Sequence, residues 1–452
     1  MISFVEIMTD RSGTYALSVM GESGHRHILC SDPRDVASHL NLACQVSDCT
    51  VFTPDCRPFF DLGVSPPLGL IDLRVAYGQK RLIRRSLENT TSVLVPRLRS
   101  LQKLIRAEQR AREVARVDPE KVSFFQGLGS VLGEWLGDRA ELLTELGRWT
   151  PGHVLTTCAQ RIDVLRALHR IERSGVHHAN GSTRMFELDP YVGKTGRFRS
   201  IGFDCMGIPH GEPRKRIVSR HVGGKICSFD FNAIDYRCIV ASVDDPKFRE
   251  LYRDTSDFHL RTCQLLRGYP DDPWTRTGTL PDEQQRRIVK QSTYTSVYGG
   301  QPSTLAKQIG VDEERARRFM VRLAEVLAPV HRLRESLYAQ VQLTGKVCLP
   351  NGRVIEIDLD AHAGKVIGLY AQSYSSWVFE RALVWIDQNI DRIAPRSMPI
   401  FPVHDELVFD MHPDELGTVD ELARGMTSPA WAVPGMDLVV KAKMGDNYDE
   451  TA

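Results

Sequence analysis

The sequence predicts an α+β fold in three parts, and three observations lead to this prediction. In residues 1–78, short apolar runs alternate with turn-forming stretches, as in a small α/β unit. In residues 94–193, apolar residues recur mainly with helical spacing until a polar, glycine-containing stretch follows. In residues 194–452, strand-like apolar runs occur together with a long helical stripe. At about 150 residues per domain, 452 residues are expected to form roughly two to four domains.

The apolar runs of the first part define its expected strands. They are Ser3–Ile7, Tyr15–Val19, Thr50–Phe52 and Leu70–Val75. The helical pattern of the second part extends from Leu94 to about Gly175.

The composition is that of a soluble globular chain, with 42% hydrophobic and 25% charged residues. No run of about 18 uncharged apolar residues occurs, so no membrane-spanning helix is expected. Acidic Glu6 and Asp10 near the start argue against a secretory signal. Ten cysteines without a C-x-x-C pair indicate reduced thiols. We therefore expect a cytoplasmic location, which is the host cytoplasm if the protein is viral.

Positive charge is concentrated in two clusters, although the net charge is only +1. Between Lys80 and Arg116 there are 11 basic and 3 acidic residues. The second cluster consists of Arg214, Lys215, Arg216, Arg220 and Lys225. Such stripes on a near-neutral chain favour a surface that binds polyanions. Either cluster alone fits a solvated helix face equally well.

A carboxylate follows a short apolar run in the segment KICSFDFNAIDYR. Residues Ile226–Phe229 read as a buried strand that carries Asp230 to its end. Rigid backbone then holds the carboxylate at the edge of a cleft, as a catalytic metal ligand requires. The alternative is a turn or capping aspartate.

Three polar residues, His404, Asp405 and Glu406, separate two β-like runs in IFPVHDELVFDM. The runs, Pro399–Val403 and Leu407–Asp410, predict a tight hairpin with carboxylates at its tip. Mg²⁺ prefers oxygen ligands and often uses one or two carboxylates together with substrate phosphates. An acidic, solvent-exposed turn is the alternative.

Four residues form a stripe in DEQQRRIVKQSTYTSVYGG. Arg286, Lys290, Tyr294 and Tyr298 are spaced four apart, which places them along one side of a helix that ends at Gly299-Gly300. Two cations followed by two aromatic rings can bind a triphosphate at one end and stack a base at the other. An amphipathic helix with its polar face in solvent is the alternative.

These segments, in this order, resemble the three polymerase motifs of family A DNA polymerases, the DNA polymerase I type. FDFNAIDYR is similar to motif A, RRIVKQSTYTSVYGG to the motif B helix and VHDELVF to motif C. The flanking segments KTGRFRS, DFHLRTC, LPNGRV, GLYAQSYSSWVFERAL and KAKMGDNYDE agree, so the resemblance covers about Lys194 to Ala452. The small size and divergence resemble phage or mobile-element members of the family.

The resemblance implies a right-hand polymerase fold. Residues 194–452 would form the palm and fingers, with the fingers at about 245–345. Residues 94–193 would form a reduced, helical thumb-like or linker region. Residues 1–93 would form a small, degenerate RNase H-like domain of the exonuclease type. The implied activity is addition of dNTPs to a primer 3′-hydroxyl on a DNA template.

The resemblance also implies a catalytic centre with two Mg²⁺ ions, for which Mn²⁺ can substitute. Asp230, Asp405 and the backbone carbonyl of Phe231 would bind the metals, and Glu406 would lie beside them. The implied nucleotide-binding residues are Arg286, Lys290 and His259 for the triphosphate, with Lys290 also protonating pyrophosphate, Tyr294 against the sugar and base, and Tyr298 at the template-base position.

Three further residues resemble the contacts that family members make with the primer–template minor groove. They are Arg197, Gln372 and His404, and such contacts sense pairing geometry without reading sequence. Primer–template DNA and dNTPs are thus the implied partners. A processivity factor, a helicase and a separate exonuclease are further candidate partners.

The chain departs from the family pattern at several positions. Asp235 stands where the family has a glutamate that crowds a ribose 2′-hydroxyl, so sugar discrimination is open. Gly368 and Lys365 stand where asparagine and arginine are usual. The first strand, SFVEIMTD, has no Asp-x-Glu, and Asp55 and Asp72 are the only remnants of an exonuclease carboxylate set. We therefore expect no 3′→5′ proofreading.

Two alternative functions remain. A single-subunit RNA polymerase shares the palm and the Arg/Lys/Tyr helix, but Glu406 and the carboxylate of Asp235 argue against it. An inactive, polymerase-like DNA-binding subunit would not need the predicted metal ligands or the triphosphate-binding cations.

Overall fold

The computed structural model describes residues 2–9, 15–21, 24–30, 50–53, 70–72, 152–189, 195–255, 257–266 and 282–451. The chain divides into two compact units, Met1–His169 and Arg170–Ala452. The predicted helices of 94–151, the cluster from Lys80 to Arg116, Asp55 and Lys194 lie outside the described residues. No helix in the described part of the chain has the length and apolar character needed to cross a membrane.

The first unit contains a mixed five-stranded sheet. Its order is β3 (Gly24–Cys30), β2 (Tyr15–Gly21), β1 (Ile2–Thr9), β4 (Thr50–Thr53) and β5 (Leu70–Asp72). Strands β1, β2 and β3 are antiparallel, whereas β4 runs parallel to both β1 and β5. The first three predicted strands are confirmed, and the fourth is confirmed over Leu70–Asp72, its remaining residues 73–75 lying outside the described part. We missed β3, because GHRHILC opens with polar residues and lacks a clear apolar run.

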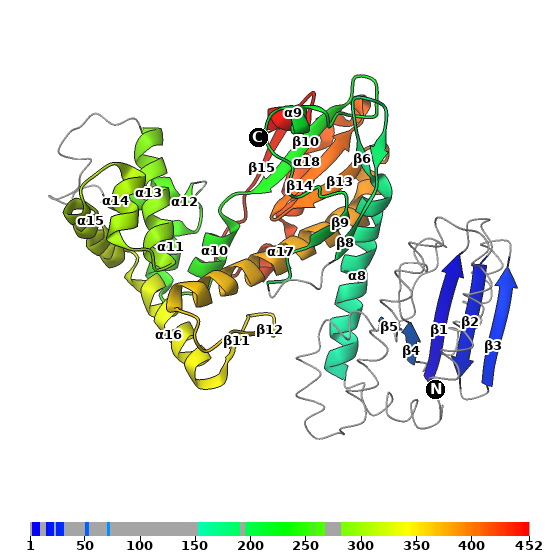
Figure 1. Ribbon diagram of the computed structural model, residues 1–452, viewed down its shortest axis with the longest axis horizontal. Helices are drawn as coiled ribbons and strands as arrows, with labels where there is room; N and C mark the ends of the chain where they lie inside the picture. The colour runs from blue at the N-terminus through cyan, green and yellow to red at the C-terminus, as the bar shows by residue number, and fades with distance from the viewer. Residues whose placement is uncertain are drawn as a thin grey trace. The chain divides into compact units, whose positions relative to one another are not determined.

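An antiparallel four-stranded sheet forms the centre of the second unit (Figure 1). Its order is β13 (Met398–Val403), β14 (Glu406–Met411), β10 (Lys225–Phe231) and β15 (Val440–Gly445). The interior of β10 is buried on both faces, and Phe229 packs edge-on against Phe409 of β14 at a centroid distance of 5.1 Å. Close packing of large side chains such as these holds the central strands together in the observed register.

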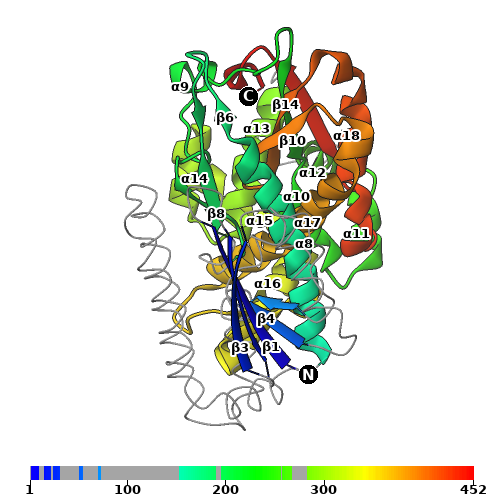
Figure 2. The same ribbon diagram turned by 90° about the vertical axis from the view of Figure 1, so that its right-hand side faces the viewer.

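The long helix α17 (Ala363–Ile393) and the short helix α18 (Val419–Met426) cover one side of this sheet (Figures 1 and 2). Phe379 of α17 contacts Phe231 at the end of β10, with ring centroids 6.3 Å apart. The core continues through α10 (Ile234–Ala241), whose Cys238, Ile239 and Val240 are fully buried.

A group of helices and a small hairpin lie between β10 and α17 in sequence. They are α11 (Pro246–Tyr252), α12 (Phe258–Leu266), α13 (Asp282–Val297), α14 (Pro302–Ile309), α15 (Glu313–Val326), α16 (Ala328–Thr344), β11 (Lys346–Cys348) and β12 (Val354–Glu356). The predicted helix is confirmed as α13. Its hydrogen bonding continues to the Tyr298 amide, and Gly299 ends it with a φ of 80°.

Short elements complete the second unit. They are β6 (Val176–His177), β7 (Thr183–Arg184), β8 (Phe186–Asp189), β9 (Arg199–Gly202), α9 (Glu212–Lys215) and the 3₁₀ turns η2 (Pro413–Thr418), η3 (Ser428–Ala432) and η4 (Tyr448–Thr451).

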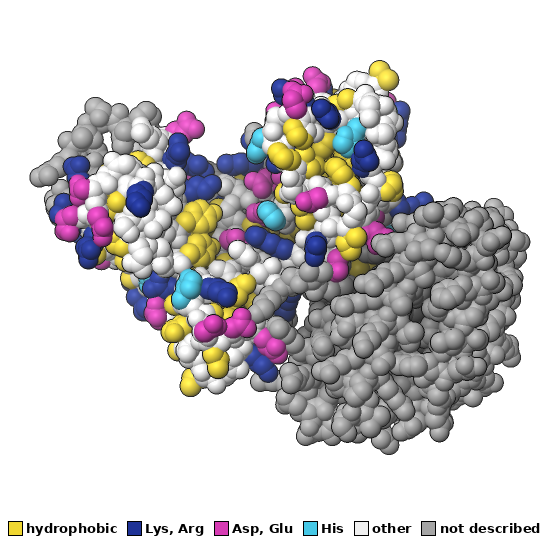
Figure 3. All heavy atoms as spheres, in the orientation of Figure 1, with side chains coloured by type: hydrophobic (Ala, Val, Ile, Leu, Met, Phe, Trp, Pro, Cys, Tyr) yellow, Lys and Arg dark blue, Asp and Glu magenta, His cyan; other side chains and the backbone are white. Residues whose placement is uncertain are grey.

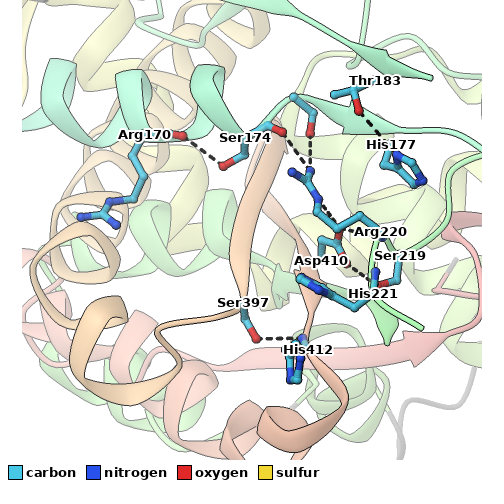
Figure 4. A network of polar contacts seen from close by, with 11 residues as sticks. Arg170, Ser174, His177, Thr183, Ser219, Arg220, His221, Ser397, Asp410 and His412 are labelled. Carbon is cyan, nitrogen blue, oxygen red and sulfur yellow. Dashed lines mark hydrogen bonds and ion pairs between the residues drawn. The ribbon is translucent and has the colours of Figure 1, made fainter. Parts of the chain in front are cut away.

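An arginine–aspartate pair, in which the aspartate is buried, joins the sheet to the helix α8 (Gly152–Ser174), as Figure 4 shows. The Arg220 Nε donates to Asp410 of β14 at 2.8 Å, and its Nη2 donates to the carbonyls of Ser174 and Gly175. Ser219 donates to the second oxygen of Asp410 at 2.5 Å. A cation at the C-terminal end of a helix satisfies carbonyls that the helix itself leaves open.

A second arginine, Arg237 of α10, joins three separate loops beneath the sheet end. Its guanidinium donates to the carbonyls of Asn232, Thr255 and Asp437, and the residue is 1% exposed. These loops precede α10, α12 and β15. One buried side chain therefore fixes the entry points of three elements.

Replacing Arg237 with alanine should destabilise the protein strongly. The substitution removes three charge-assisted hydrogen bonds and leaves three carbonyls without their donor, which should cost roughly 3 kcal/mol or more. Arg249→Ala is the matched control, because among the described residues this arginine donates to a single carbonyl, that of Val243. Thermal unfolding of both variants measures the effect. Equal losses of Tm would contradict the joining role of Arg237.

Candidate active site

A cavity of about 570 Å³ lies at the edge of the central sheet that faces α13. Lys and Arg side chains gather around this hollow (Figure 3). Its lining comprises His210, Arg214, Ser228, Asp230, Phe231, Asn232, Ala233, Ile234, Asp235, Tyr236, His259, Arg286, Lys290, Tyr294, Asp405, Glu406, Lys441, Lys443 and Thr451. Most of the site residues that we predicted from the sequence are therefore brought together.

Strand pairing places the carboxylates of this cavity. Asp230, the second-last residue of β10, is paired with Glu406, the first residue of β14. Asp405 lies in the two-residue turn before β14, and its carbonyl accepts from the Phe231 amide at 3.3 Å. The turn requires His404 at a φ of 58°, as two-residue hairpins commonly do. The predicted hairpin is confirmed.

Backbone strain gathers at the same place. His404 and Ala233, at φ values of 58° and 54°, are the non-glycine residues with positive φ in the described part of the chain. His404 directly precedes Asp405, and Ala233 lies three residues after Asp230. Uncommon backbone conformations of this kind cluster at functional sites because surrounding structure must hold them in place.

The two aspartates repel one another in a partly buried environment. Burial, followed by the neighbouring charges of Asp230 and Asp235, raises the pKa of Asp405 to about 7. Burial also raises the pKa of Asp230, although Lys441, Lys443 and Lys290 oppose this effect. A divalent cation between such carboxylates would offset both the burial and the repulsion.

Glu406 differs from the aspartates because it already has hydrogen-bond donors. Ser228 donates to its Oε1 at 2.5 Å, and the Tyr448 hydroxyl lies 3.5 Å from its Oε2. Burial raises the pKa of Glu406, and the Ser228 hydrogen bond opposes that shift.

The donor set fits Mg²⁺ or Mn²⁺ with substrate completing the coordination. Among the described residues, no three His, Cys, Asp or Glu side chains converge as a closed metal site. Two carboxylates facing a cavity match a hard cation that keeps water and phosphate oxygens as its other ligands.

Helix α13 and α12 supply the opposite wall. Arg286 forms a charge-assisted hydrogen bond with Asp257, whose carboxylate also accepts from the Leu260 amide at the start of α12. Lys290, one turn later, is exposed to the cavity. His259 is 3% exposed, and its Nδ1 has no hydrogen-bond partner among the described residues. A buried polar atom of this kind is suited to a ligand.

Aromatic rings extend this wall. Tyr294 lines the cavity and lies within 6.0 Å of the rings of Tyr236, His259 and Tyr298, measured between centroids. Tyr298 is not part of the cavity lining. Its ring lies against Gly368. A Cβ atom at this position would be 3.5 Å from the ring carbons of Tyr298, in van der Waals contact with them.

Asp235 is held by two residues outside the cavity lining. Ser375 of α17 donates to its Oδ1 at 2.5 Å, and the Arg197 guanidinium lies 3.5 Å from its Oδ2. His404 and Gln372 are close to this group, because Arg197 and Asp235 influence the His404 pKa and Ser375 also donates to the Gln372 carbonyl. The three predicted DNA-contacting residues are therefore near Asp235 but do not line the cavity.

Several residues that shape the site were not predicted from the sequence. They are Asp257, Ser228, Tyr236, Ser375, Lys441 and Lys443. Asp257 and Ser375 have no local signal, because their partners are distant in sequence. The alternation Lys441-Ala442-Lys443 could have suggested two lysines on one face of a strand.

Known proteins match the half of the chain that carries this cavity. A family model described as DNA polymerase family A matches residues 176–450, which is more than half of the chain. The chain belongs to DNA polymerase family A. The family assignment made from the sequence is thereby confirmed.

Curated relatives agree with the family model. The chain is 27% identical to DNA polymerase I of Pseudomonas aeruginosa over 276 residues, which is 57% of this chain and 29% of that protein. It is 24% identical to the DNA polymerase of Mycobacterium phage D29 over 222 residues, which is 49% of this chain and 34% of that protein. The chain thus spans about a third of the length of these relatives.

A solved structure shares the fold. The POL domain of Pol1 from M. smegmatis, in complex with DNA primer-template and dNTP, aligns with a TM-score of 0.62 at 18% identity, covering 99% of this chain and 96% of that chain. The predicted right-hand polymerase fold is confirmed. The exonuclease-like character of residues 1–93 stays a prediction.

The buried imidazole of His259 should make the protein sensitive to acid. Burial lowers the His259 pKa from 6.5 to about 4, so the unfolded chain binds a proton between these values that the folded chain does not. Stability from this residue is complete above pH 6.5 and is lost as the pH falls towards 4, by at most roughly 3 kcal/mol.

The Tm of His259→Gln should therefore fall less than the Tm of the wild type as the pH is lowered. Tm values between pH 4.5 and 7.5 measure this effect, with exposed His210→Gln as the control. Parallel Tm curves for His259→Gln and the wild type would contradict the assignment.

Proposed function

We propose that this chain is a DNA-dependent DNA polymerase that adds dNTPs to a primer 3′-hydroxyl. The observation that carries the proposal is one cavity in which Asp230 and Asp405 face Arg286, Lys290 and Tyr294. The carboxylates on one wall suit metal ions. The cations and the aromatic ring on the other wall suit the phosphates and the base of a nucleoside triphosphate. Membership of DNA polymerase family A supports the same reaction.

The catalytic residues act by binding and positioning. Asp230, Asp405 and the Phe231 carbonyl would hold two Mg²⁺ ions, with Mn²⁺ as a substitute, and Glu406 would stand beside them. Metals held there would supply activation of the primer hydroxyl and neutralisation of charge on the leaving pyrophosphate. Lys290 would protonate that pyrophosphate.

The remaining cavity residues orient the nucleotide. Arg286 binds the triphosphate and is itself oriented by Asp257. Buried His259 is neutral at pH 7, because its pKa is about 4, and contributes a hydrogen bond without charge. Tyr294 lies against the sugar and base, and Tyr298 stands at the template position.

Primer–template DNA is the proposed macromolecular partner. Arg197, Gln372 and His404 would contact its minor groove without reading sequence. The proposed division is an exonuclease-like domain at 1–93 without proofreading activity, a thumb-like region at 94–193, and a palm with fingers at 194–452. A cytoplasmic location and a helper such as a processivity factor, helicase or separate exonuclease belong to the same proposal.

Removing either metal-binding carboxylate should abolish nucleotide addition. Asp230→Ala and Asp405→Asn should lower kcat by roughly 10²–10³-fold or more, because each removes charge that stabilises the transition state. Asp405→Asn should leave the Tm unchanged or higher, since burial disfavours the ionised form. Primer extension with Mg²⁺ and dNTPs measures the rate, and primer–template Kd should stay near the wild-type value.

The exposed residue Asp360 provides a matched control as Asp360→Ala. A near wild-type rate of primer extension by Asp230→Ala or Asp405→Asn would contradict the catalytic assignment.

Sugar selectivity should depend on Asp235 and on the serine that holds it. Asp235→Ala should lower the dCTP-to-CTP ratio of kcat/KM by roughly 10-fold or more, as expected for a lost contact in a pocket. Ser375→Ala should lower this ratio less, because the Asp235 carboxylate, once released from Ser375, still contacts the sugar part of the time. The ratio is measured opposite template G.

A double-mutant cycle separates this effect from general damage. Ser375→Ala should change nothing further in the Asp235→Ala background. Ser373→Ala removes an equally buried hydroxyl without a hydrogen-bond partner among the described residues and should behave like the wild type. An equal effect of Ser375→Ala in both backgrounds would show that Ser375 does not act through Asp235.

A further inference from the structure

Two lysines on the edge strand β15 form a basic wall of the active-site cavity. Lys441 is paired with Asp230 and Lys443 with Ser228 across the β10–β15 ladder. Residues two apart on a strand project from the same face, so both lysines share the face of Asp230. Both are exposed and both line the cavity.

The charge of these lysines is available to a ligand. No ion pair joins Lys441 or Lys443 to a carboxylate in the described part of the chain, whereas Lys225 at the far end of β10 is paired with Asp446 at 2.5 Å. Nearby Arg214 is also held, because its Nε donates to the Ile208 carbonyl and its guanidinium lies 4.5 Å over the Tyr448 ring.

The lysines contribute a large share of the positive charge that lines the cavity. The lining contains four carboxylates, Asp230, Asp235, Asp405 and Glu406, and five permanent cations, Arg214, Arg286, Lys290, Lys441 and Lys443. Without the two β15 lysines, three cations would remain, and Asp257 pairs with one of them, Arg286. The two lysines therefore contribute much of the positive charge that an incoming polyanion meets.

The two basic walls stand on either side of the carboxylates. Asp230 experiences the charges of Lys441 and Lys443 from β15 and that of Lys290 from α13. A polyphosphate between α13 and the sheet end therefore meets cations from both directions.

We propose that Lys441 and Lys443 form a second polyphosphate-binding arm, opposite Arg286 and Lys290. The ligand is the polyphosphate group, present either as pyrophosphate or as the triphosphate of a nucleotide. Its identity as product or substrate rests on the proposed polymerase function. The ammonium groups bind phosphate oxygens as point charges and need no fixed geometry, which suits a group that must also leave.

Binding of inorganic pyrophosphate to the full chain tests the arm without catalysis. Calorimetric titration with and without Mg²⁺ gives the Kd. The double substitution Lys441→Ala with Lys443→Ala should raise it roughly 10-fold or more, because two charged contacts are lost. The charge-conserving pair Lys441→Arg with Lys443→Arg should restore most of the affinity. Lys307→Ala with Lys346→Ala makes the same change of charge outside the cavity and should have no effect.

Steady-state kinetics distinguish the two sources of polyphosphate. If the product is the main ligand, the alanine pair weakens inhibition by pyrophosphate more than it raises the KM for dNTP. If the triphosphate is the main ligand, the KM rises at least as much. Both results support the arm.

Two results would overturn the inference. An unchanged pyrophosphate Kd would mean that the lysines only protect the sheet edge. A raised primer–template Kd with unchanged pyrophosphate binding would place DNA phosphates on them. Lysine-dependent pyrophosphate binding in a protein that extends no primer would support the arm and refute the polymerase function instead.

Discussion

The antiparallel pairing of β10 with β14 is the constraint on which the site depends. Its register sets Asp230 opposite Glu406 and brings the hairpin turn with Asp405 to the end of β10. A shift by one residue would turn Asp230 to the other face of the sheet and bury its charge. The fully buried Phe229, Leu407 and Phe409 oppose this shift, because it would disrupt their close packing, including the edge-on contact of Phe229 with Phe409. Hydrophobic burial in the strands therefore determines where the charged groups lie.

The other walls of the cavity are attached to this sheet end by few, specific contacts. Arg237 holds the loops before α10, α12 and β15 through three carbonyls. At Gly364 of α17, a Cβ atom would lie 2.0 Å from the Tyr298 carbonyl, so only glycine allows α13 to end this close to α17. Asp257 then orients Arg286 from the start of α12. Apolar packing stabilises the sheet and helices, and specific polar contacts orient the functional side chains.

Local sequence patterns predicted the parts of the site that lie on a single element. The hairpin around Asp405, the strand that ends at Asp230 and the stripe on α13 each leave a signal within about a dozen residues, because the periods of strands and helices are short. Pairs across the fold leave no such signal. Ser375 with Asp235 and Arg286 with Asp257 exist only after folding, and β15 was read only as a family resemblance. The strand β3 was missed because it opens with polar residues.

A metal-binding experiment tests the assignment of the cavity. Crystals of the full chain with a dideoxy-terminated primer–template, a matching dNTP and Mn²⁺ would locate the metal by anomalous scattering. We predict Mn²⁺ between Asp230 and Asp405, with the triphosphate between Lys290 and the two lysines of β15. A bound dNTP without Mn²⁺ at these carboxylates, or Mn²⁺ held elsewhere, would contradict the assignment.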